Sequence, residues 1–570
     1  MSTILSYDPT ELKQALITYL QSKPAFADFN YEGSAILTTI DFLTRNTNYI
    51  AYMANMVGTE SFLDSAQLRA NVVSHAQKLT YIPKSRTATT VNVDIEVIPT
   101  TTPDVNTFSI TCNKGSTFLN TIDNVNYQFT NTDDLILFKT VDNTFKATDV
   151  NLKQGQIVSE DFLYTSGSKI EISNVDVDTS TLRVYVKESS SSTTQTEYTK
   201  VSDITEVAAD GYFYYLYENT KGLFEIEFGK NVLGYDPLDN SVVTIEYVIC
   251  ESDHANGIST LIAATPIENY SNITITVNTN GYGGSEKNDI DFIKFIAPKV
   301  YETQNRAVRI QDYETLMLRD FGFIRSAKAW GGEDNVPPYY GKVFLCAIPQ
   351  SGFIIADSVK TIIENQMKSY SMMGPIVVDA QYIGINLYIS ILFDANSTTD
   401  TYTQTVAKVQ TVINDYNATL KTFDFWYNNS KLSKNIRDIS SITSIEINKE
   451  IFFDLTVSQN KTEKYIVEFL NKIEPSSLMI TDIVLDATAT NQYITDDGNG
   501  NVIKNVTISG VETTEIIGSI DYDTGYTEFT SFIISPDTIR VVAIPTTDNV
   551  YTERMFAVYI NSSQIDRISR

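Results

Sequence analysis

Histidines, cysteines and paired carboxylates are the residues that would do chemistry in this chain, and their spacing argues against it. The 570 residues include His75 and His254, and the three cysteines are Cys112, Cys250 and Cys346. No HExxH, nucleophile-elbow or CxxC pattern gathers a nucleophile, a base or a set of metal ligands. With 70 acidic residues, carboxylate pairs arise by chance, so a hydrolase built on two carboxylates has little support. The sequence predicts no enzyme, no cofactor and no metal site, and His75 is expected to pack or to form a hydrogen bond.

A glycine-rich segment, Gly281-Tyr-Gly-Gly-Ser-Glu, precedes a predicted helix over residues 286–297. Such a loop can bind phosphate at the start of a helix. Here no Gly-Lys-Ser/Thr follows and the glycines lack the GxGxxG spacing. We therefore interpret the segment as a chain reversal at a domain border.

The charge balance excludes one large class of partners. The chain has 42 Lys and Arg against 70 Asp and Glu, a net charge of −28, and no long basic run. Nucleic-acid binding needs a clustered basic surface, so the sequence predicts no nucleic-acid partner.

Cysteine use and hydropathy predict a soluble chain made in the cytoplasm. The three cysteines lie far apart in strand-like runs and leave one thiol over, which favours a reducing compartment without disulfides. No stretch approaches the roughly 18 apolar residues that span a membrane. The first residues lack the basic and apolar regions of a secretory signal, so we expect no membrane insertion.

Three helices are predicted at the start of the chain. The first, over residues 8–22, has Asp8 at its N-cap and Pro9 at its first helical position. The second runs over residues 35–57 and ends near Gly58, and the third ends before Pro83.

The second helix carries two apolar stripes. Successive steps of four and three residues, typical of a coiled-coil seam, connect Ile36, Ile40, Leu43, Thr47, Ile50, Ala54 and Val57. A second stripe, with a spacing of seven, consists of Phe42, Tyr49 and Met56. One neighbour does not need this much apolar surface. The helix therefore lies either inside a bundle of its own chain or in a bundle with other chains, with Thr47 as a candidate for setting the register.

After Pro83 the apolar period changes from about 3.6 to 2, which predicts half-buried strands. The alternating positions include Val91, Val93, Ile95 and Val97, then Leu182, Val184 and Val186, then Phe224, Ile226 and Phe228. Later the order strand, helix, strand, helix predicts a small α+β region, and period 2 returns from Phe452 onward.

The predicted fold is a multidomain α+β protein. We expect N-terminal bundle helices over 1–87, a β-rich domain over 88–284, central helices and a strand over 285–350, a small α+β domain over 351–455 and a β-rich C-terminal domain over 456–570.

Several motifs in chain order resemble the baseplate wedge proteins (gene six products) of T-even-type contractile-tailed phages, within the baseplate J-like superfamily. They are Asn30-Tyr-Glu-Gly-Ser, Phe62-Leu-Asp-Ser-Ala, Phe228-Gly-Lys-Asn-Val-Leu-Gly, Asn305-Arg-Ala-Val, Asp312-Tyr-Glu, Trp330-Gly-Gly-Glu-Asp-Asn and Ile517-Gly-Ser-Ile-Asp. The motif residues singled out are Gly229, Gly234, Asn305, Arg306, Asp312, Tyr313, Trp330, Gly331 and Gly332. We expect structural roles for them. Arg309, where Thr is more usual, predicts a weaker helix cap.

The resemblance implies an architectural role in the virion tail baseplate, assembled in the cytoplasm of a host bacterium. It implies pairing of the chain with itself within a wedge and closure of the wedges into a ring around the central hub. It also implies bundling of the N-terminal helices with a larger wedge protein, and docking of small tail-lysozyme-like and other wedge proteins. The two apolar stripes of the second helix suit such a bundle.

One other class of function remains open. The Tyr-rich β regions, with 34 tyrosines in the chain, suit a carbohydrate-binding tail or surface protein. Such proteins more often show a repeat or a fibre-like period, and none is found.

Overall fold

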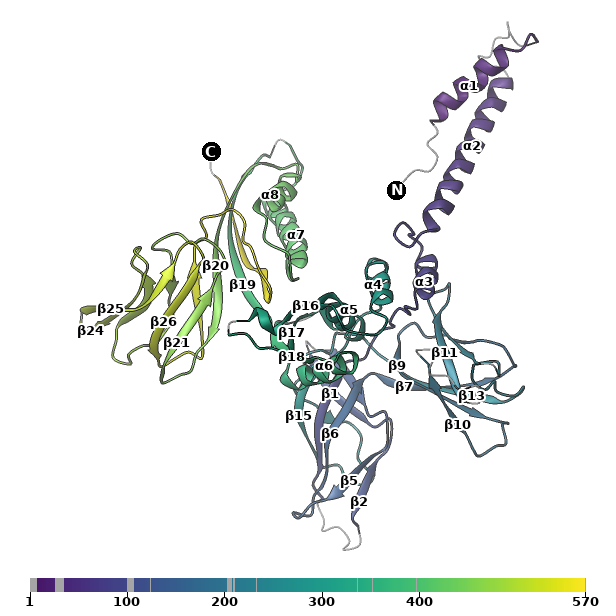
Figure 1. Cartoon of the computed structure of the whole chain (residues 1–570), viewed down its shortest axis with the longest axis horizontal. Coiled ribbons are helices and arrows are strands. Elements are labelled where there is room, and N and C mark those ends of the chain that lie inside the picture. Colours follow the sequence, from purple (N-terminus) through teal and green to yellow (C-terminus); the bar gives the residue numbers. More distant parts are fainter. Residues whose placement is uncertain are drawn as a thin grey trace. The chain divides into compact units, whose positions relative to one another are not determined.

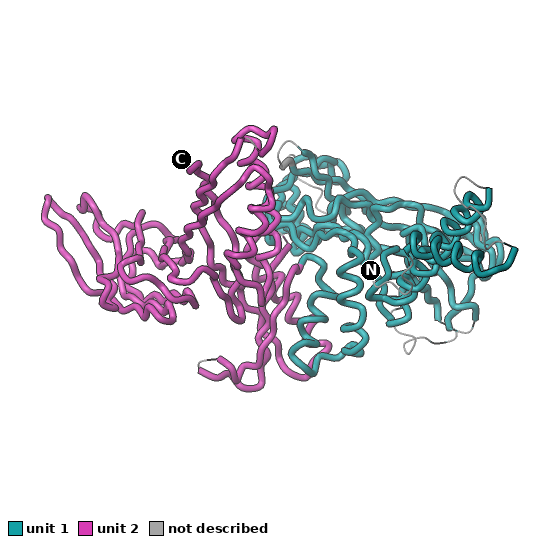
Figure 2. The backbone as a smooth tube through the Cα atoms, turned by 90° about the horizontal axis from the view of Figure 1, so that it is seen from above, with its two compact units in different colours: residues 1–323 teal, residues 324–570 magenta. Residues whose placement is uncertain are grey.

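The computed structural model describes residues 8–25, 35–99, 107–122, 125–201, 208, 211–231, 233–335, 337–350, 352–395 and 397–568. The chain divides into two compact units, residues 1–323 and 324–570 (Figure 2). It is a multidomain α+β protein, with helices at the start, a β-rich middle and a β-rich C-terminal part (Figure 1).

Unit 1 begins with the three predicted helices, α1 (Pro9–Gln21), α2 (Ala35–Glu60) and α3 (Arg69–Lys78). Asp8 is the N-cap of α1, because its carboxylate accepts a hydrogen bond of 2.7 Å from the backbone N–H of Thr10. Helix α2 ends at Glu60, two residues after the Gly58 near which the sequence predicted its end. The Thr59 hydroxyl donates back to the carbonyl of Asn55, which keeps this last turn helical.

Two sheets form the β-rich middle of unit 1. The first has eight strands, namely β1 (Thr90–Val97), β2 (Ser109–Cys112), β3 (Thr117–Ile122), β4 (Val125–Thr130), β5 (Leu135–Lys139), β6 (Phe145–Gln154), β14 (Ile262–Ala263) and β15 (Ile273–Tyr282). The second has seven, namely β7 (Gln156–Leu163), β8 (Ile170–Ile172), β9 (Val177–Lys187), β10 (Thr196–Lys200), β11 (Phe213–Glu218), β12 (Phe224–Phe228) and β13 (Val242–Ile249).

The predicted period of 2 is confirmed in these sheets. Val91, Val93, Ile95 and Val97 of β1 are all buried, and the strand pairs antiparallel with β6 on one side and β15 on the other. The alternating residues of β9 and β12 lie in the core of the second sheet. Each sheet therefore has its own hydrophobic core.

Unit 1 ends with α4 (Ile290–Thr303) and α5 (Ile310–Asp320). The sequence placed the first of these helices about four residues too early. It begins at Ile290 because the Asp289 carboxylate caps it, accepting a hydrogen bond of 2.6 Å from the backbone N–H of Phe292. The helix then continues through Pro298.

Unit 2 contains a small sheet and a large one. The small sheet has β16 (Ile324–Gly331), β17 (Lys342–Pro349) and β18 (Gly374–Asp379). Between β16 and β17 lies the short 3-10 helix η2 (Gly332–Asp334). Strands β17 and β18 are parallel, and the crossover between them is α6 (Asp357–Tyr370).

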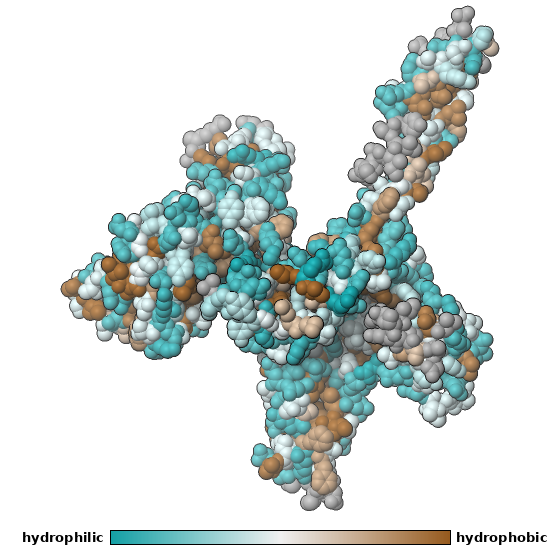
Figure 3. All heavy atoms as spheres, viewed as in Figure 1, coloured by the Kyte–Doolittle hydropathy of each residue, from teal (hydrophilic) through white to brown (hydrophobic). Residues whose placement is uncertain are grey.

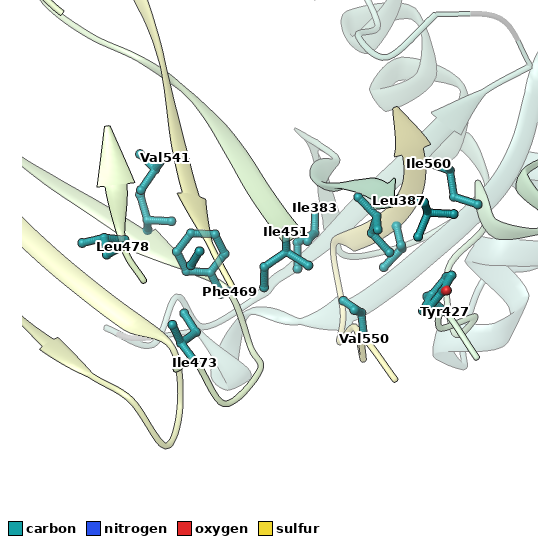
Figure 4. Close-up of a cluster of buried hydrophobic side chains, with 14 of the residues drawn as sticks. Ile383, Leu387, Tyr427, Ile451, Phe469, Ile473, Leu478, Val541, Val550 and Ile560 are labelled. Atoms are coloured by element: carbon teal, nitrogen blue, oxygen red, sulfur yellow. The ribbon is translucent and has the colours of Figure 1, made fainter. Parts of the chain in front are cut away.

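The large sheet has ten strands, namely β19 (Gln381–Phe393), β20 (Ile442–Thr456), β21 (Lys461–Glu468), β22 (Met479–Ile480), β23 (Asn491–Asp496), β24 (Asn501–Ile508), β25 (Val511–Asp521), β26 (Tyr526–Ile533), β27 (Thr538–Ala543) and β28 (Phe556–Arg567). Helices α7 (Tyr402–Leu420) and α8 (Asn429–Arg437) lie between β19 and β20 in the chain. Figure 4 shows part of the core, where Ile383 and Leu387 of β19 gather with Ile451 of β20 and Ile560 of β28.

Two predicted domain borders fall inside these sheets. The predicted border between residues 350 and 351 lies between β17 and β18, which are neighbouring strands of the small sheet. The border after residue 455 lies within β20. One hydrophobic core includes residues from β19 through β28, together with α7 and α8. The five-part division of the chain stays a prediction.

Candidate assembly surface and the motif residues

Helix α2 is covered on one face. Helix α1 packs along it, and the Lys13 ammonium lies 2.6 Å from a carboxylate oxygen of Asp41. Ile40 and Ala51 are buried, whereas Ile36 and Thr47 are half-buried. Only part of the predicted seam therefore meets its own chain.

The opposite face of α2 is apolar and exposed. This exposed apolar face of α2 consists of Phe42, Leu43, Tyr49, Ile50, Met53, Met56 and Val57. The exposed fraction of these side chains runs from 36% for Met56 to 68% for Phe42. At 100° per residue, Phe42 lies about 200° around the axis from the buried Ile40. Figure 3 shows apolar side chains exposed along this helix.

The structure thus divides the predicted interface residues between two faces. Ile40 and Thr47 belong to the covered side, Ala54 is exposed, and the three residues of the second stripe lie on the exposed face with Leu43, Ile50 and Val57. Sequence reasoning missed Met53, although it follows Tyr49 by four residues and Ile50 by three. Binding of other chains by these residues stays a prediction.

The turn from α2 to α3 is held by Glu60. Its carboxylate accepts hydrogen bonds from the backbone N–H groups of Gln67 and Leu68 and from the Asn71 side chain at 2.8 Å. The hydrogen bond from Asn71 is the main reason that the pKa of Glu60 lies below its usual value. His75 Nε2 lies 3.0 Å from the Glu60 carbonyl, which confirms the hydrogen-bonding role expected for this histidine.

Helix α3 is anchored by a buried carboxylate. Glu218, at the end of β11, has a fully buried side chain. Its oxygens lie 2.7 Å from Arg69 Nε of α3 and 2.9 Å from Lys287 Nζ. Apolar residues of α3, among them Val72 and Ala76, share a core with α4. No local sequence pattern predicts the ion pair between Arg69 and Glu218, because these residues lie 149 positions apart in the chain.

The segment after α3 is fixed by Asn288 and Lys84. The Asn288 side-chain oxygen accepts hydrogen bonds from the Tyr81 hydroxyl at 3.0 Å and from the Lys84 backbone at 2.7 Å. Lys84 Nζ donates to the carbonyl of Asp320. Burial lowers the pKa of Lys84 to about 8, because the neighbouring Asp320 offsets only part of the desolvation.

Removal of the Lys84 charge should change how stability depends on pH. The pKa is about 8 in the folded chain and 10.5 for an ordinary lysine, so between these values the unfolded chain binds more protons and folding becomes more favourable as pH rises. Relative to Lys84→Met, the wild-type chain should therefore gain on the order of 3 kcal/mol of unfolding free energy between pH 7.5 and 10.5. Urea titrations at several pH values would measure this gain.

The exposed Lys78 offers a matched control. Lys78→Met, which also exchanges one lysine for methionine, provides the reference for the loss of an exposed charge. If Lys84→Met gave curves parallel to those of the wild-type chain, Lys84 would not be buried as a partly desolvated cation.

The motif around Gly229 is a tight turn. Lys230 and Asn231 both have positive φ, at 52° and 56°, and the Leu233 backbone N–H donates to the Gly229 carbonyl at 3.0 Å. A Cβ on Gly229 would lie 1.9 Å from the carbonyl oxygen of Leu233, so only glycine fits there, and Gly234 has a φ of +105°.

Asp312, in the first turn of α5, fixes the start of this helix as one half of a capping box. Its carboxylate accepts hydrogen bonds from the backbone N–H groups of Val308 and Arg309, and the Arg309 guanidinium lies 2.9 Å away. Burial raises the pKa of Asp312, but these donors outweigh it and hold the pKa below its usual value. Asn305 accepts a hydrogen bond from Arg319, Arg306 donates to Gln304, and Tyr313 is buried.

The Trp330 motif closes a loop. The indole N–H donates to the Asn335 side chain at 2.9 Å, and the ring stacks on Phe344 with centroids 6.0 Å apart. A Cβ on Gly332 would lie 1.9 Å from the carbonyl oxygen of Tyr339, whereas Gly331 faces only the Glu333 side chain.

The remaining candidates for chemistry have packing roles. At the glycine-rich segment, a Cβ on Gly284 would lie 2.3 Å from the carbonyl oxygen of Ser252, so the glycine permits close backbone packing. All three cysteines are buried and free. Within the described residues, no group of three or more His, Cys, Asp or Glu is placed to hold a metal ion, and no helix is long and apolar enough to cross a membrane. The stretch Asn30–Ser34 lies outside the described residues.

Two family matches correspond to these structural regions. Residues 8–81, which contain α1, α2 and α3, match the helical domain of the gp6-like baseplate wedge proteins. Residues 310–378, which contain α5 and the three-stranded sheet, match C-terminal domain I of the baseplate structural protein gp6. These two stretches of the chain are thus similar to domains of gp6-like baseplate wedge proteins.

The chain is also similar to the baseplate wedge protein gp6 of Enterobacteria phage T4. It is 28% identical over 413 residues, which are 68% of this chain and 61% of the T4 protein. The match thus spans less than two thirds of that relative. A structural alignment pairs this chain with a chain of the sixfold-symmetrised cryo-EM structure of the anti-feeding prophage baseplate. It covers 76% of this chain and 86% of that chain, with 12% sequence identity. The TM-score is 0.28, which is too low to establish a shared fold.

Proposed function

We propose that this chain is a structural, non-enzymatic subunit of a contractile-tail baseplate wedge, located in the virion tail baseplate and assembled in the host cytoplasm. The observation that carries the proposal is the exposed apolar face of α2, which lies within the region that matches the gp6-like helical domain. Monomeric soluble proteins rarely leave so many large apolar side chains of one helix face in water, so this surface suits burial against other helices.

The proposed partners are a second copy of the chain, a larger wedge protein and the smaller wedge proteins, including a tail-lysozyme-like one. Helix α2 has two apolar faces, and α1 occupies one of them. The other can join a bundle without disturbing the α1–α2 pair. Pairs joined through further contacts would close a ring of wedges around the hub. A carbohydrate-binding role has no specific observation in its favour.

A shortened chain that begins at Thr59 tests the proposal. It lacks α1 and most of α2 but keeps Glu60, which holds the start of α3, and it keeps the core that α3 shares with α4. When co-expressed with the larger wedge protein, the full chain should give a complex whose mass contains both proteins, and the shortened chain should not. The measurement is native mass spectrometry of the purified complexes.

Circular dichroism and thermal unfolding would verify that the shortened chain keeps its β-rich regions. If this folded, shortened chain associated with itself and with the larger wedge protein as the full chain does, the assembly role of α2 would be wrong.

A further inference from the structure

The β24–β25 hairpin of unit 2 ends in an unpaired strand edge. Residues 511–516 of β25 pair with β24 on one side only, whereas residues 518–521 also pair with β26. Every residue from Val511 to Ile516 is exposed, and within the described chain no strand pairs with this side. Figure 1 shows β24 and β25 at the far left of the drawing. The unpaired backbone N–H and C=O groups can accept a further strand.

The edge is free because the chain bends at Gly518. Val502 of β24 pairs with Gly518 and Ile503 pairs with Ile516, so Ile517 is an extra residue in β25. Such a bulge bends a strand away from its neighbour. A Cβ on Gly518 would lie 2.0 Å from the carbonyl oxygen of Glu528 in β26, so the close approach at the bend requires glycine.

The side chains of the edge have a symmetric pattern. The sequence of residues 511–516 is Val-Glu-Thr-Thr-Glu-Ile, with an exposed apolar residue at each end and a carboxylate next to it. The two threonine hydroxyls donate back to β24, to the Val506 carbonyl and the Asn505 side chain. Lys504 lies 3.9 Å from Glu515, whose side chain is still 71% exposed.

We propose that this edge binds an extended segment of another protein by strand addition, and that the segment carries basic residues opposite Glu512 and Glu515. Backbone hydrogen bonds supply the affinity in this mode of recognition, and alternate side chains supply the specificity. The complementary partner is an antiparallel strand with the residue order apolar, basic, polar, polar, basic, apolar. Its basic residues lie opposite Glu512 and Glu515, and its apolar residues lie opposite Val511 and Ile516.

A second copy of the chain is disfavoured at this edge. Antiparallel pairing of two copies about the centre of the strand would place Glu512 opposite Glu515 twice, and like charges directly opposite destabilise a sheet. The net charge of −28 on each copy adds to this repulsion. The charges thus favour a basic strand from a different protein.

Designed peptides test the proposal on the full chain. A fluorescent peptide with the central residues Ile-Lys-Thr-Thr-Lys-Val should bind saturably in anisotropy titrations, and Ile-Glu-Thr-Thr-Glu-Val should bind at least roughly tenfold more weakly. Two further versions of the lysine peptide carry N-methyl groups on alternate backbone nitrogens, in opposite phase. Because successive N–H groups of a strand point to opposite edges, only one of these two versions should bind.

A charge-swapped chain, with Glu512→Lys and Glu515→Lys, should prefer the glutamate peptide. A control chain with Glu446→Lys and Glu553→Lys, two exposed sites on β20 and in the loop before β28, should keep the original preference. Absence of saturable binding, equal binding of both methylated peptides or an unchanged preference in the swapped chain would each overturn the proposal. So would self-association of the chain that the lysine peptide displaces, because a second copy would then occupy the edge.

Discussion

A chain that carries Ile50→Asp and Met53→Asp is expected to lose its association with partner chains while α1 and α2 stay paired. Both side chains lie on the exposed apolar face of α2, at 58% and 42% exposure, so neither supports its own fold. In a bundle, each substitution removes an apolar contact and buries a carboxylate without a partner. Association should weaken by on the order of a hundredfold, a difference of roughly 3 kcal/mol, measured by sedimentation or by co-purification with the larger wedge protein.

Two other variants of α2 distinguish loss of the exposed apolar face from loss of the α1–α2 pairing and from the effect of an added charge. Ile40→Asp changes a residue that is only 3% exposed, so it should separate α1 from α2 and reduce the helical circular dichroism. Asn48→Asp adds a charge at an exposed polar position and should leave association unchanged. If the double variant associated as tightly as the wild-type chain, the exposed apolar face would not be the bundle surface.

Glu218→Gln is expected to destabilise unit 1 by about 3 kcal/mol, because it leaves Arg69 and Lys287 without their shared counter-charge. Burial lowers the pKa of Lys287, and Glu218 offsets only part of that effect. Because Arg69 belongs to α3, the loss should be largest in the hydrogen-exchange protection of that helix. Urea unfolding of the full chain measures the total effect.

Glu171→Gln is the matched control for Glu218→Gln. Glu171 contacts Lys221 at the surface, where an ion pair contributes less than about 1 kcal/mol. Equal effects of the two substitutions would mean that the Glu218 cluster does not anchor α3.

Local pattern was enough to predict most of the helices and the strands with the clearest alternation of apolar and polar residues. In β1 the apolar residues Val91, Val93, Ile95 and Val97 alternate with polar residues. All four are buried, because one face of the strand packs against the core. Asp8 and Pro9 located the start of α1. Helix α8 was missed because Leu432 and Ile436 are its only buried residues, although the Asn428 N-cap was a usable signal.

Features that depend on distant residues were not predictable. Glu218 forms an ion pair with Arg69, which lies 149 residues earlier in the chain, and Gln381 of β19 pairs with Phe556 of β28. Local sequence patterns do not predict contacts over such separations. The borders drawn at 350 and 455 follow changes of period, but strands on both sides share sheets. On α2, spacing identified most of the apolar residues, but it did not identify Met53, and it could not tell which residues α1 covers and which stay exposed.

The parallel pairing of β19 with β28 has a consequence for synthesis on the ribosome. Gln381 of β19 pairs with Phe556 of β28, so the large sheet cannot be completed until the chain has been translated to Arg567. Until then, the edge of β19 that pairs with β28 is unpaired, and the apolar residues that β28 covers are exposed. Aggregation is most favourable in this incomplete state. Unit 1, residues 1–323, is complete in the nascent chain before β19 is translated. During synthesis, the need for chaperones should therefore be greatest for nascent unit 2.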